Sequence, residues 1–258
     1  MEEDPGKTKR KLRRKLEEAR REVKELGGWA AFKSGEWLLS LIQKTFRNYY
    51  ERANVEYFTA KYGSRDPDFI ARKLTTVAAA NGAILGAVVG AAVSTNEILT
   101  IITAGGAGIS LSANVGIAFT TIAAEAVLLV RMQLQLVANM AKLYGVPLDL
   151  DDPEDILTIL AFAVGGSVAE AAGKAGMKVG RKFTEQAIRR HVSRHVLEGI
   201  KSVGRKLGVR ILQRTILKYA LPLVSMGIGS SWNYTATKAV ARIAKKHLLA
   251  RAADLAGA

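Results

Sequence analysis

The sequence predicts an all-α protein, a compact multi-helix bundle with glycine-packed central helices and a charged N-terminal helical arm. Apolar residues recur at helical spacing, no strict apolar and polar alternation is bounded by hairpin turns, and the apolar content is mainly Ala, Val, Leu, Ile and Gly. The 258 residues, 49% of them hydrophobic, suffice for one sizeable core. We expect an arm over residues 1–50 and a helical domain over residues 51–258.

The first 50 residues form the predicted arm and a second amphipathic helix. Residues 7–26 are mostly charged, and Gly27-Gly28 ends this first helix. Its apolar residues share a helical spacing: Leu12, Leu16, Ala19, Val23 and Leu26. Residues 29–48 repeat large apolar side chains and predict the second helix. A short polar and aromatic segment follows, and Ser64-Arg65-Asp66-Pro67 predicts a turn that begins a new helix with Pro near its first position.

The middle of the chain is poor in charge. Between Lys73 and Glu97 lie 23 residues without a formal charge. Three glycines in this run, spaced by four, share one helix face: Gly82, Gly86 and Gly90. A second run over residues 98–130 contains only Glu125, and the segment GGAG divides it into a short helix and a long helix over about residues 112–144, which Gly145-Val146-Pro147 ends.

The C-terminal part carries most of the positive charge. Residues 156–258 hold 18 Lys and Arg against 4 Asp and Glu, which is +14 of the net +15. Asp152-Pro153-Glu154-Asp155 predicts the start of an apolar helix over residues 153–172. Residues 174–218 then place 13 Lys and Arg beside an apolar stripe at helical spacing. A charge-free segment over residues 219–237 and a polar helix complete the chain.

The residue types present exclude several kinds of chemistry. Cys is absent, which rules out disulfides, thiolate nucleophiles and Cys-ligated metal centres. Among three His, His191 and His195 lie four apart but lack the Glu of a His-Glu-x-x-His zinc motif. The acids of residues 149–155 lack the glycine and distal Glu of a calcium-binding EF-hand loop, so helix capping explains them. We therefore expect no metal and no cofactor.

The basic amphipathic region predicts a polyanionic partner. Anionic membrane lipids are favoured over nucleic acid, because apolar residues keep helical spacing beside the charges and no known DNA- or RNA-binding motif is present. A solvated bundle surface covered by Lys and Arg stems is the structural alternative. The predicted anion- and lipid-binding residues are Lys178, Arg181, Lys182, Arg189, Arg190, Arg194, Lys201, Arg205 and Lys206.

The glycine face and Glu125 each allow two interpretations. Glycines spaced by four let helix backbones approach closely, either in lipid or inside a soluble core. Residues 75–130 form a candidate membrane hairpin with both ends cytoplasmic, because Arg72 and Lys73 precede it and Arg131 follows it. Glu125 lies among apolar residues, so its carboxyl is either a polar site within the bundle that needs a partner or a group that reaches the surface.

Two segments resemble the bacterial EcsC family. In TAGGAGISLSANVGIAFTTIAAEAVLLVRMQLQLVANMAKLYGVPLDLDDPEDILTIL, an acid lies inside an apolar helix, and A-x-x-Y-G precedes a D-P-E helix start. In LPLVSMGIGSSWNYTATKAVARIAKKHLLAR, Pro and spaced Gly precede an Asn and an Ala-rich basic helix. With the glycine-rich helix they cover roughly residues 70–251, so the arm lies outside the match, and the family more often has Asp where this chain has Glu125. The resemblance implies a mostly helical bacterial protein, named for an operon that also encodes an ABC transporter, without an established activity.

These observations favour a non-enzymatic, membrane-associated protein of the bacterial cytoplasm. The N-terminus begins with acids and a charged helix, where a secretory signal would be apolar. Basic helices would bind anionic head groups, and the hairpin over residues 75–130 would insert or pack beneath them. A membrane protein complex and a second copy of the chain are further candidate partners. The alternatives are a soluble helical nucleic-acid-binding module and an enzyme of unknown reaction built around Glu125.

Overall fold

The computed structural model describes residues 5–92, 113–148, 155, 205 and 225–257 of the chain. In these ranges the protein is helical and contains no strand, which confirms the all-α fold class. The described residues form the helices α1 (Pro5–Glu25), α2 (Gly28–Ser34), α3 (Glu36–Arg52), α4 (Val55–Tyr62), α5 (Pro67–Ala92), α7 (Ala113–Leu143) and α11 (Ser225–Ala256).

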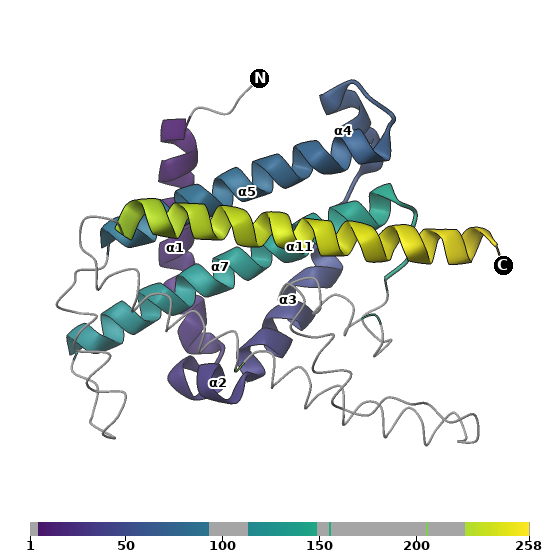
Figure 1. Cartoon of the computed structure of the whole chain (residues 1–258). Coiled ribbons are helices and arrows are strands. Elements are labelled where there is room, and N and C mark those ends of the chain that lie inside the picture. Colours follow the sequence, from purple (N-terminus) through teal and green to yellow (C-terminus); the bar gives the residue numbers. More distant parts are fainter. Residues whose placement is uncertain (1–4, 93–112, 149–154, 156–204, 206–224, 258) are drawn as a thin grey trace, which may run out of the picture.

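The three longest helices, α5, α7 and α11, pack together, and α1 runs crosswise over α5 and α7 (Figure 1). Helix α5 is antiparallel to the other two. Its first turn meets the end of α7 and the second half of α11, since Asp68 contacts Tyr144 and Lys245. Its second half approaches the first half of α11, since Gly82 lies against Asn233. This arrangement fixes which parts of the sequence share an end of the bundle.

The apolar stripe of α1 belongs to the same core as the long helices. Leu12, Leu16, Ala19 and Val23 are all buried and join one hydrophobic cluster with the buried residues of α3, α5, α7 and α11. Charged residues cover the outer side of α1. The predicted arm is therefore packed on the bundle, and only one of its faces meets solvent.

The helix predicted over residues 29–48 is divided in two by Gly35, so that prediction is wrong at this point. Gly35 has a φ of 86°, a left-handed conformation that glycine adopts without steric cost. Its N–H donates to the Ala31 carbonyl at 2.9 Å and ends α2. The break lets Phe32 stack on Trp37, with ring centroids 4.5 Å apart. Local apolar spacing predicted helix on both sides, but the glycine turn redirects the chain.

Helix α4 lies inside the polar and aromatic segment for which no helix was predicted. The Asn54 side chain accepts a hydrogen bond from the Tyr57 N–H at 2.8 Å and caps its start. Gly63, with a φ of 64°, ends it by donating to the Thr59 carbonyl at 2.9 Å. Because the helix has no fully buried residue, it leaves little apolar periodicity in the sequence.

The predicted start of α5 and the predicted end of α7 are confirmed. Helix α5 begins at Pro67, and the Asp66 carboxylate accepts from the Asp68 N–H at 2.9 Å. Helix α7 ends at Leu143, and Gly145, whose φ is 67°, forms the turn that follows. There the Val146 N–H donates to the Ala141 carbonyl at 2.9 Å and completes a Schellman turn.

The end of the chain forms one helix where two segments were expected. Helix α11 runs over 32 residues and joins the charge-free segment to the polar helix without a break. No proline occurs within it, so the backbone hydrogen-bond ladder can continue. The short helix predicted before the segment GGAG, the helix predicted over residues 153–172 and the basic amphipathic region over residues 174–218 fall largely or wholly outside the described residues.

Candidate functional site

The three long helices share one uncharged end. No Lys, Arg, Asp or Glu occurs in residues 74–92 of α5, 113–124 of α7 or 225–237 of α11. Because α5 is antiparallel to the other two helices, these three stretches meet at one end of the bundle, on the left of Figure 1. We call them the uncharged end. The sequence shows each stretch separately, and only the helix directions bring them together.

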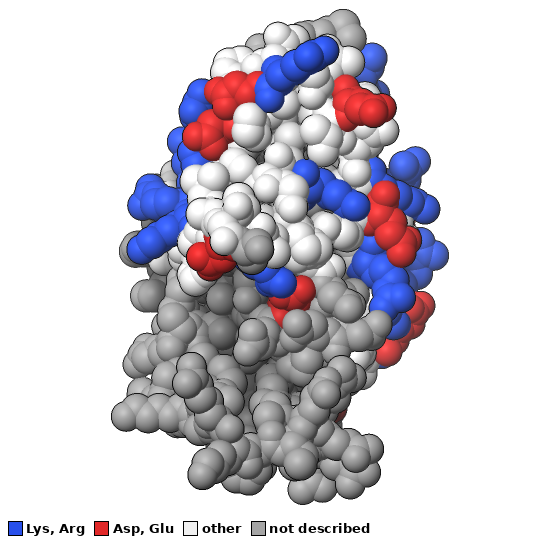
Figure 2. Space-filling view, turned by 90° about the vertical axis from the view of Figure 1, so that its right-hand side faces the viewer, with Lys and Arg blue, Asp and Glu red and all other residues white. Residues whose placement is uncertain are grey.

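The opposite end carries both signs of charge. Figure 2 faces the end where α5 begins and α11 finishes, and Lys, Arg, Asp and Glu side chains are interspersed there among uncharged ones. We call this the charged end. The bundle is therefore polarised along its long axis.

Among the helices that the structure describes, two have the length and composition of membrane spans. Residues 67–90 and 120–143 both qualify, but a helix in the core of a soluble protein shares these properties. The apolar window on α7 is 78% buried inside the bundle, whereas that on α5 is 44% buried. The apolar surface available to a membrane is therefore offered more by α5 than by α7.

The predicted glycine face lies within the bundle, since Gly82, Gly86 and Gly90 are all buried. A Cβ atom added to Gly82 would lie 3.3 Å from Thr237 Oγ1 and 3.4 Å from the Asn233 carbonyl oxygen. Both atoms belong to α11. Gly82 therefore allows the close approach of α5 to α11.

Glu125 lies at the inner border of the uncharged end, and its carboxyl is inside the bundle. The residue is 7% exposed, and Asn233 Nδ2 donates to its Oε1 at 2.9 Å. Asn233 is itself 6% exposed, and its carbonyl accepts from the Thr237 hydroxyl at 2.8 Å. The acid thus has a buried partner on another helix, and the surface interpretation does not apply.

Helix α1 crosses α7 at this same border. Arg20 Nε donates to the buried Thr121 hydroxyl at 3.1 Å, inside the uncharged stretch of α7. Arg131 pairs with Glu22 at 2.5 Å, just outside it. These contacts fix the position of α1 along α7.

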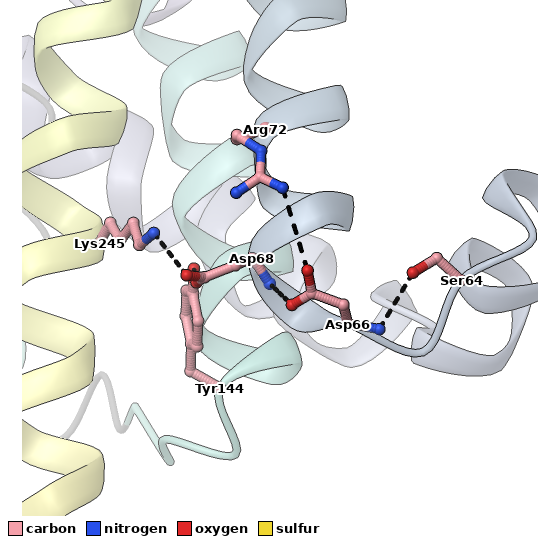
Figure 3. A network of polar contacts seen from close by, with 6 residues as sticks. All are labelled: Ser64, Asp66, Asp68, Arg72, Tyr144 and Lys245. Atoms are coloured by element: carbon pink, nitrogen blue, oxygen red, sulfur yellow. Dashed lines mark hydrogen bonds and ion pairs between the residues drawn. The ribbon is translucent and has the colours of Figure 1, made fainter.

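A polar cluster of Asp68, Tyr144 and Lys245 connects the helices at the charged end (Figure 3). The Tyr144 hydroxyl donates to Asp68 Oδ1 at 2.7 Å, and Lys245 Nζ lies 2.8 Å from Oδ2. The hydrogen bond from Lys245 lowers the pKa of Asp68 below its usual value, and the hydrogen bond from Tyr144 lowers it further. Burial of the hydroxyl group raises the pKa of Tyr144, and its hydrogen bond to Asp68 raises it further. One carboxylate therefore ties together α5, α11 and the end of α7.

Acid is expected to weaken this cluster. Because the folded pKa of Asp68 is lowered, its contribution to stability is present above the unfolded value of about 3.9 and is lost as the pH falls through the folded value. Asp68→Asn should reduce the loss of stability between neutral pH and about pH 3, by less than about 1 kcal/mol since Asp68 is partly exposed. Urea unfolding at several pH values measures this difference. An unchanged acid dependence would contradict it.

The contribution of Tyr144 to stability depends on pH in the opposite direction. Its folded pKa is raised, so its contribution is present below the ordinary tyrosine pKa of about 10 and is lost as the pH rises through the folded value. Tyr144→Phe serves as the control, because it removes one donor to Asp68 and keeps the Lys245 ion pair.

Most of the predicted lipid-binding residues lie outside the described ranges. Lys178, Arg181, Lys182, Arg189, Arg190, Arg194, Lys201 and Lys206 are not described, and Arg205 is exposed. Of the acids at the predicted helix start, Asp155 is described, is 2% exposed and pairs with Arg251. Within the described residues, no three His, Cys, Asp or Glu side chains gather where they could hold a metal ion.

Comparisons with protein-family models, with curated proteins and with solved structures find no match to this chain. Function is therefore inferred from the bundle itself.

Sequence patterns do not predict the partners of the buried and clustered acids. Asn233 is 108 residues from Glu125, and Lys245 is 177 residues from Asp68. No motif spans such separations, so only the packing of the helices pairs them. The basic N-terminal half of α1 is visible in the sequence, but the balanced charge of residues 1–155, with 20 Lys and Arg against 19 Asp and Glu, conceals it.

Proposed function

We propose that this chain is a non-enzymatic protein of the EcsC type that binds anionic lipid on the cytoplasmic side of a bacterial membrane. Its basic residues would bind lipid head groups, and the uncharged end of the bundle would enter the lipid. The observation that carries the proposal is the meeting of three uncharged helix stretches at one end. A charged side chain in hydrocarbon is costly, so these stretches, which have no charged residues of their own, are the part of this bundle suited to lipid.

The part of the uncharged end beyond the Glu125 and Asn233 pair has the length of about one lipid leaflet. Beyond the Glu125 and Asn233 pair, the three helices extend by about 12 to 18 Å at a rise of about 1.5 Å per residue. The hydrocarbon core of a bilayer is about 30 Å thick. Entry from one side is therefore favoured over complete crossing.

Exposed side chains at this end suit a membrane interface. Trp232 is 45% exposed and lies beside Asn233, at the border of the uncharged end. Val77 on α5 is 49% exposed. Tryptophan favours the boundary between head groups and hydrocarbon, since its ring is apolar and its N–H is polar.

Vesicle flotation tests the proposal. The full chain should float with vesicles of equimolar phosphatidylcholine and phosphatidylglycerol, and carbonate should fail to release it, because apolar burial persists when charge contacts are lost. Neutralising Arg181, Lys182, Arg189 and Arg190 should weaken this binding by about 1 kcal/mol per charge at low salt.

Three results would contradict the proposal in different ways. A chain that stays with the soluble fraction is not a membrane-binding protein. Release by high salt alone would exclude insertion and leave only binding to the head groups. Salt-dependent binding to DNA without binding to vesicles would favour the nucleic-acid-binding alternative.

A further inference from the structure

The N-terminal half of α1 presents a dense basic face. Residues 7–15 contain seven Lys and Arg, and the first acidic residue of the helix is Glu17. All seven are exposed. We call them the α1 basic face: Lys7, Lys9, Arg10, Lys11, Arg13, Arg14 and Lys15.

This face has a fixed orientation. On the other side of the same stretch, Thr8, Leu12 and Leu16 are buried, with exposed fractions of 7%, 5% and 3%. The two leucines belong to the core cluster. The helix cannot turn its charges away without exposing this apolar stripe, so the charges are held outward before any partner binds.

An ion pair within α1 involves one residue of this face. The ion pair of Arg14 with Glu18 spans 3.8 Å between exposed side chains, a geometry that contributes little. Partial burial lowers the pKa of Lys15. The charges of Lys11, Arg131 and Arg14 lower it further, whereas the charge of Glu18 raises it.

The basic face lies near the uncharged end. Helix α1 crosses α7 between Thr121 and Arg131, a stretch that includes Glu125 at the border of the uncharged end (Figure 1). If the uncharged end points into a membrane, α1 lies along the surface, at the level of the head groups. Basic residues at that level are attracted by anionic lipids.

We propose that the α1 basic face is a binding surface for the phosphate groups of anionic lipids, working together with the uncharged end. This deepens the proposed function and rests on it, but it assigns binding to a part of the chain separate from the basic C-terminal region. Lipid is favoured over nucleic acid because only a membrane offers an apolar phase beside its phosphates.

The test compares two variants of the full chain with the same loss of charge. The first replaces Lys9, Arg10, Arg13 and Arg14 with Gln, which favours helix and leaves the buried stripe intact. The control replaces four exposed residues elsewhere, on or beside α3, α5 and α11: Arg52, Arg65, Arg242 and Lys246, again with Gln. Circular dichroism and thermal melting establish that both variants are folded.

Binding is measured by flotation with phosphatidylcholine vesicles and with equimolar phosphatidylcholine and phosphatidylglycerol vesicles. On the anionic vesicles, the α1 variant should bind at least about tenfold more weakly than the unmodified chain. The control should change by less than about twofold, since its charges lie farther from the head groups than a Debye length of about 10 Å. On the neutral vesicles, the α1 variant and the unmodified chain should behave alike.

The outcomes separate this inference from the proposed function. If the unmodified chain binds anionic vesicles and the α1 variant binds equally well, the α1 basic face is not a lipid surface, while the proposed function stands. Equal losses in both variants would reduce the effect to net charge and overturn the inference. If the unmodified chain binds no vesicles, both fail. Loss of DNA binding alone in the α1 variant would assign the face to nucleic acid.

Discussion

Gly82→Leu is expected to destabilise the protein by about 3 kcal/mol, because it overfills the contact between α5 and α11. Even a Cβ atom at this position would lie 3.4 Å from the Asn233 carbonyl oxygen and 3.5 Å from Leu129 Cδ1. That carbonyl belongs to the backbone and also accepts from the Thr237 hydroxyl, so it cannot move without loss of another contact. The remaining leucine atoms would need space that α11 occupies.

Gly82→Ala is the matched control for this prediction. Its Cβ fits with shifts of a few tenths of an ångström, and alanine gains about 1 kcal/mol over glycine in a helix, so the net change should be small. Urea unfolding followed by circular dichroism measures both variants. If the leucine variant matches the original chain, Gly82 is not a close contact between the helices.

Asn233→Leu is expected to lower the free energy of unfolding by about 2 kcal/mol, because it removes a buried donor from the Glu125 carboxyl. Leucine has the same branched arrangement of side-chain heavy atoms as asparagine and a larger volume, so none of this loss comes from a cavity. The corresponding change at the other partner, Glu125→Leu, should lower the free energy of unfolding by a similar amount, since it leaves the buried Asn233 amide without this acceptor.

The double variant distinguishes a specific pair from two separate defects. Replacement of both partners by leucine should cost less than the sum of the two single changes, because two apolar groups can pack where two polar ones met. Glu125→Gln should be mild, since its amide oxygen can still accept from Asn233. Additive losses in the double variant would show that the Glu125 and Asn233 contact contributes no coupling energy.

Local chemistry made several elements predictable. Pro67 and Asp66 carry the start of α5, and Gly145 carries the end of α7, because a fixed φ, a capping side chain and a left-handed turn act within a few residues. The same logic failed where the local signal was weak. Gly35 lies within an apolar pattern that continues on both sides of it. Helix α4 has no buried residue, so it produces no apolar pattern in the sequence.

The candidate site was predictable in its parts but not in its assembly. Gly82, Gly86, Gly90 and Glu125 could be singled out by spacing and by an unusual charge. The partner of Glu125 could not be identified, since Asn233 lies 108 residues away and many polar residues could have served. The orientation of the α1 basic face likewise depends on which side of the helix meets the core.

The sequence by itself determined the helical class, the three charge-free stretches and the basic character of α1, because composition and periodicity are properties of neighbouring residues. Only the tertiary structure decided that these stretches share one end, with Glu125 and Asn233 at its border. The direction in which α5 packs on α7 and α11 depends on side chains distant in sequence, such as Asp68 and Lys245. Such long-range packing places the uncharged end and the charged end on opposite sides of the bundle.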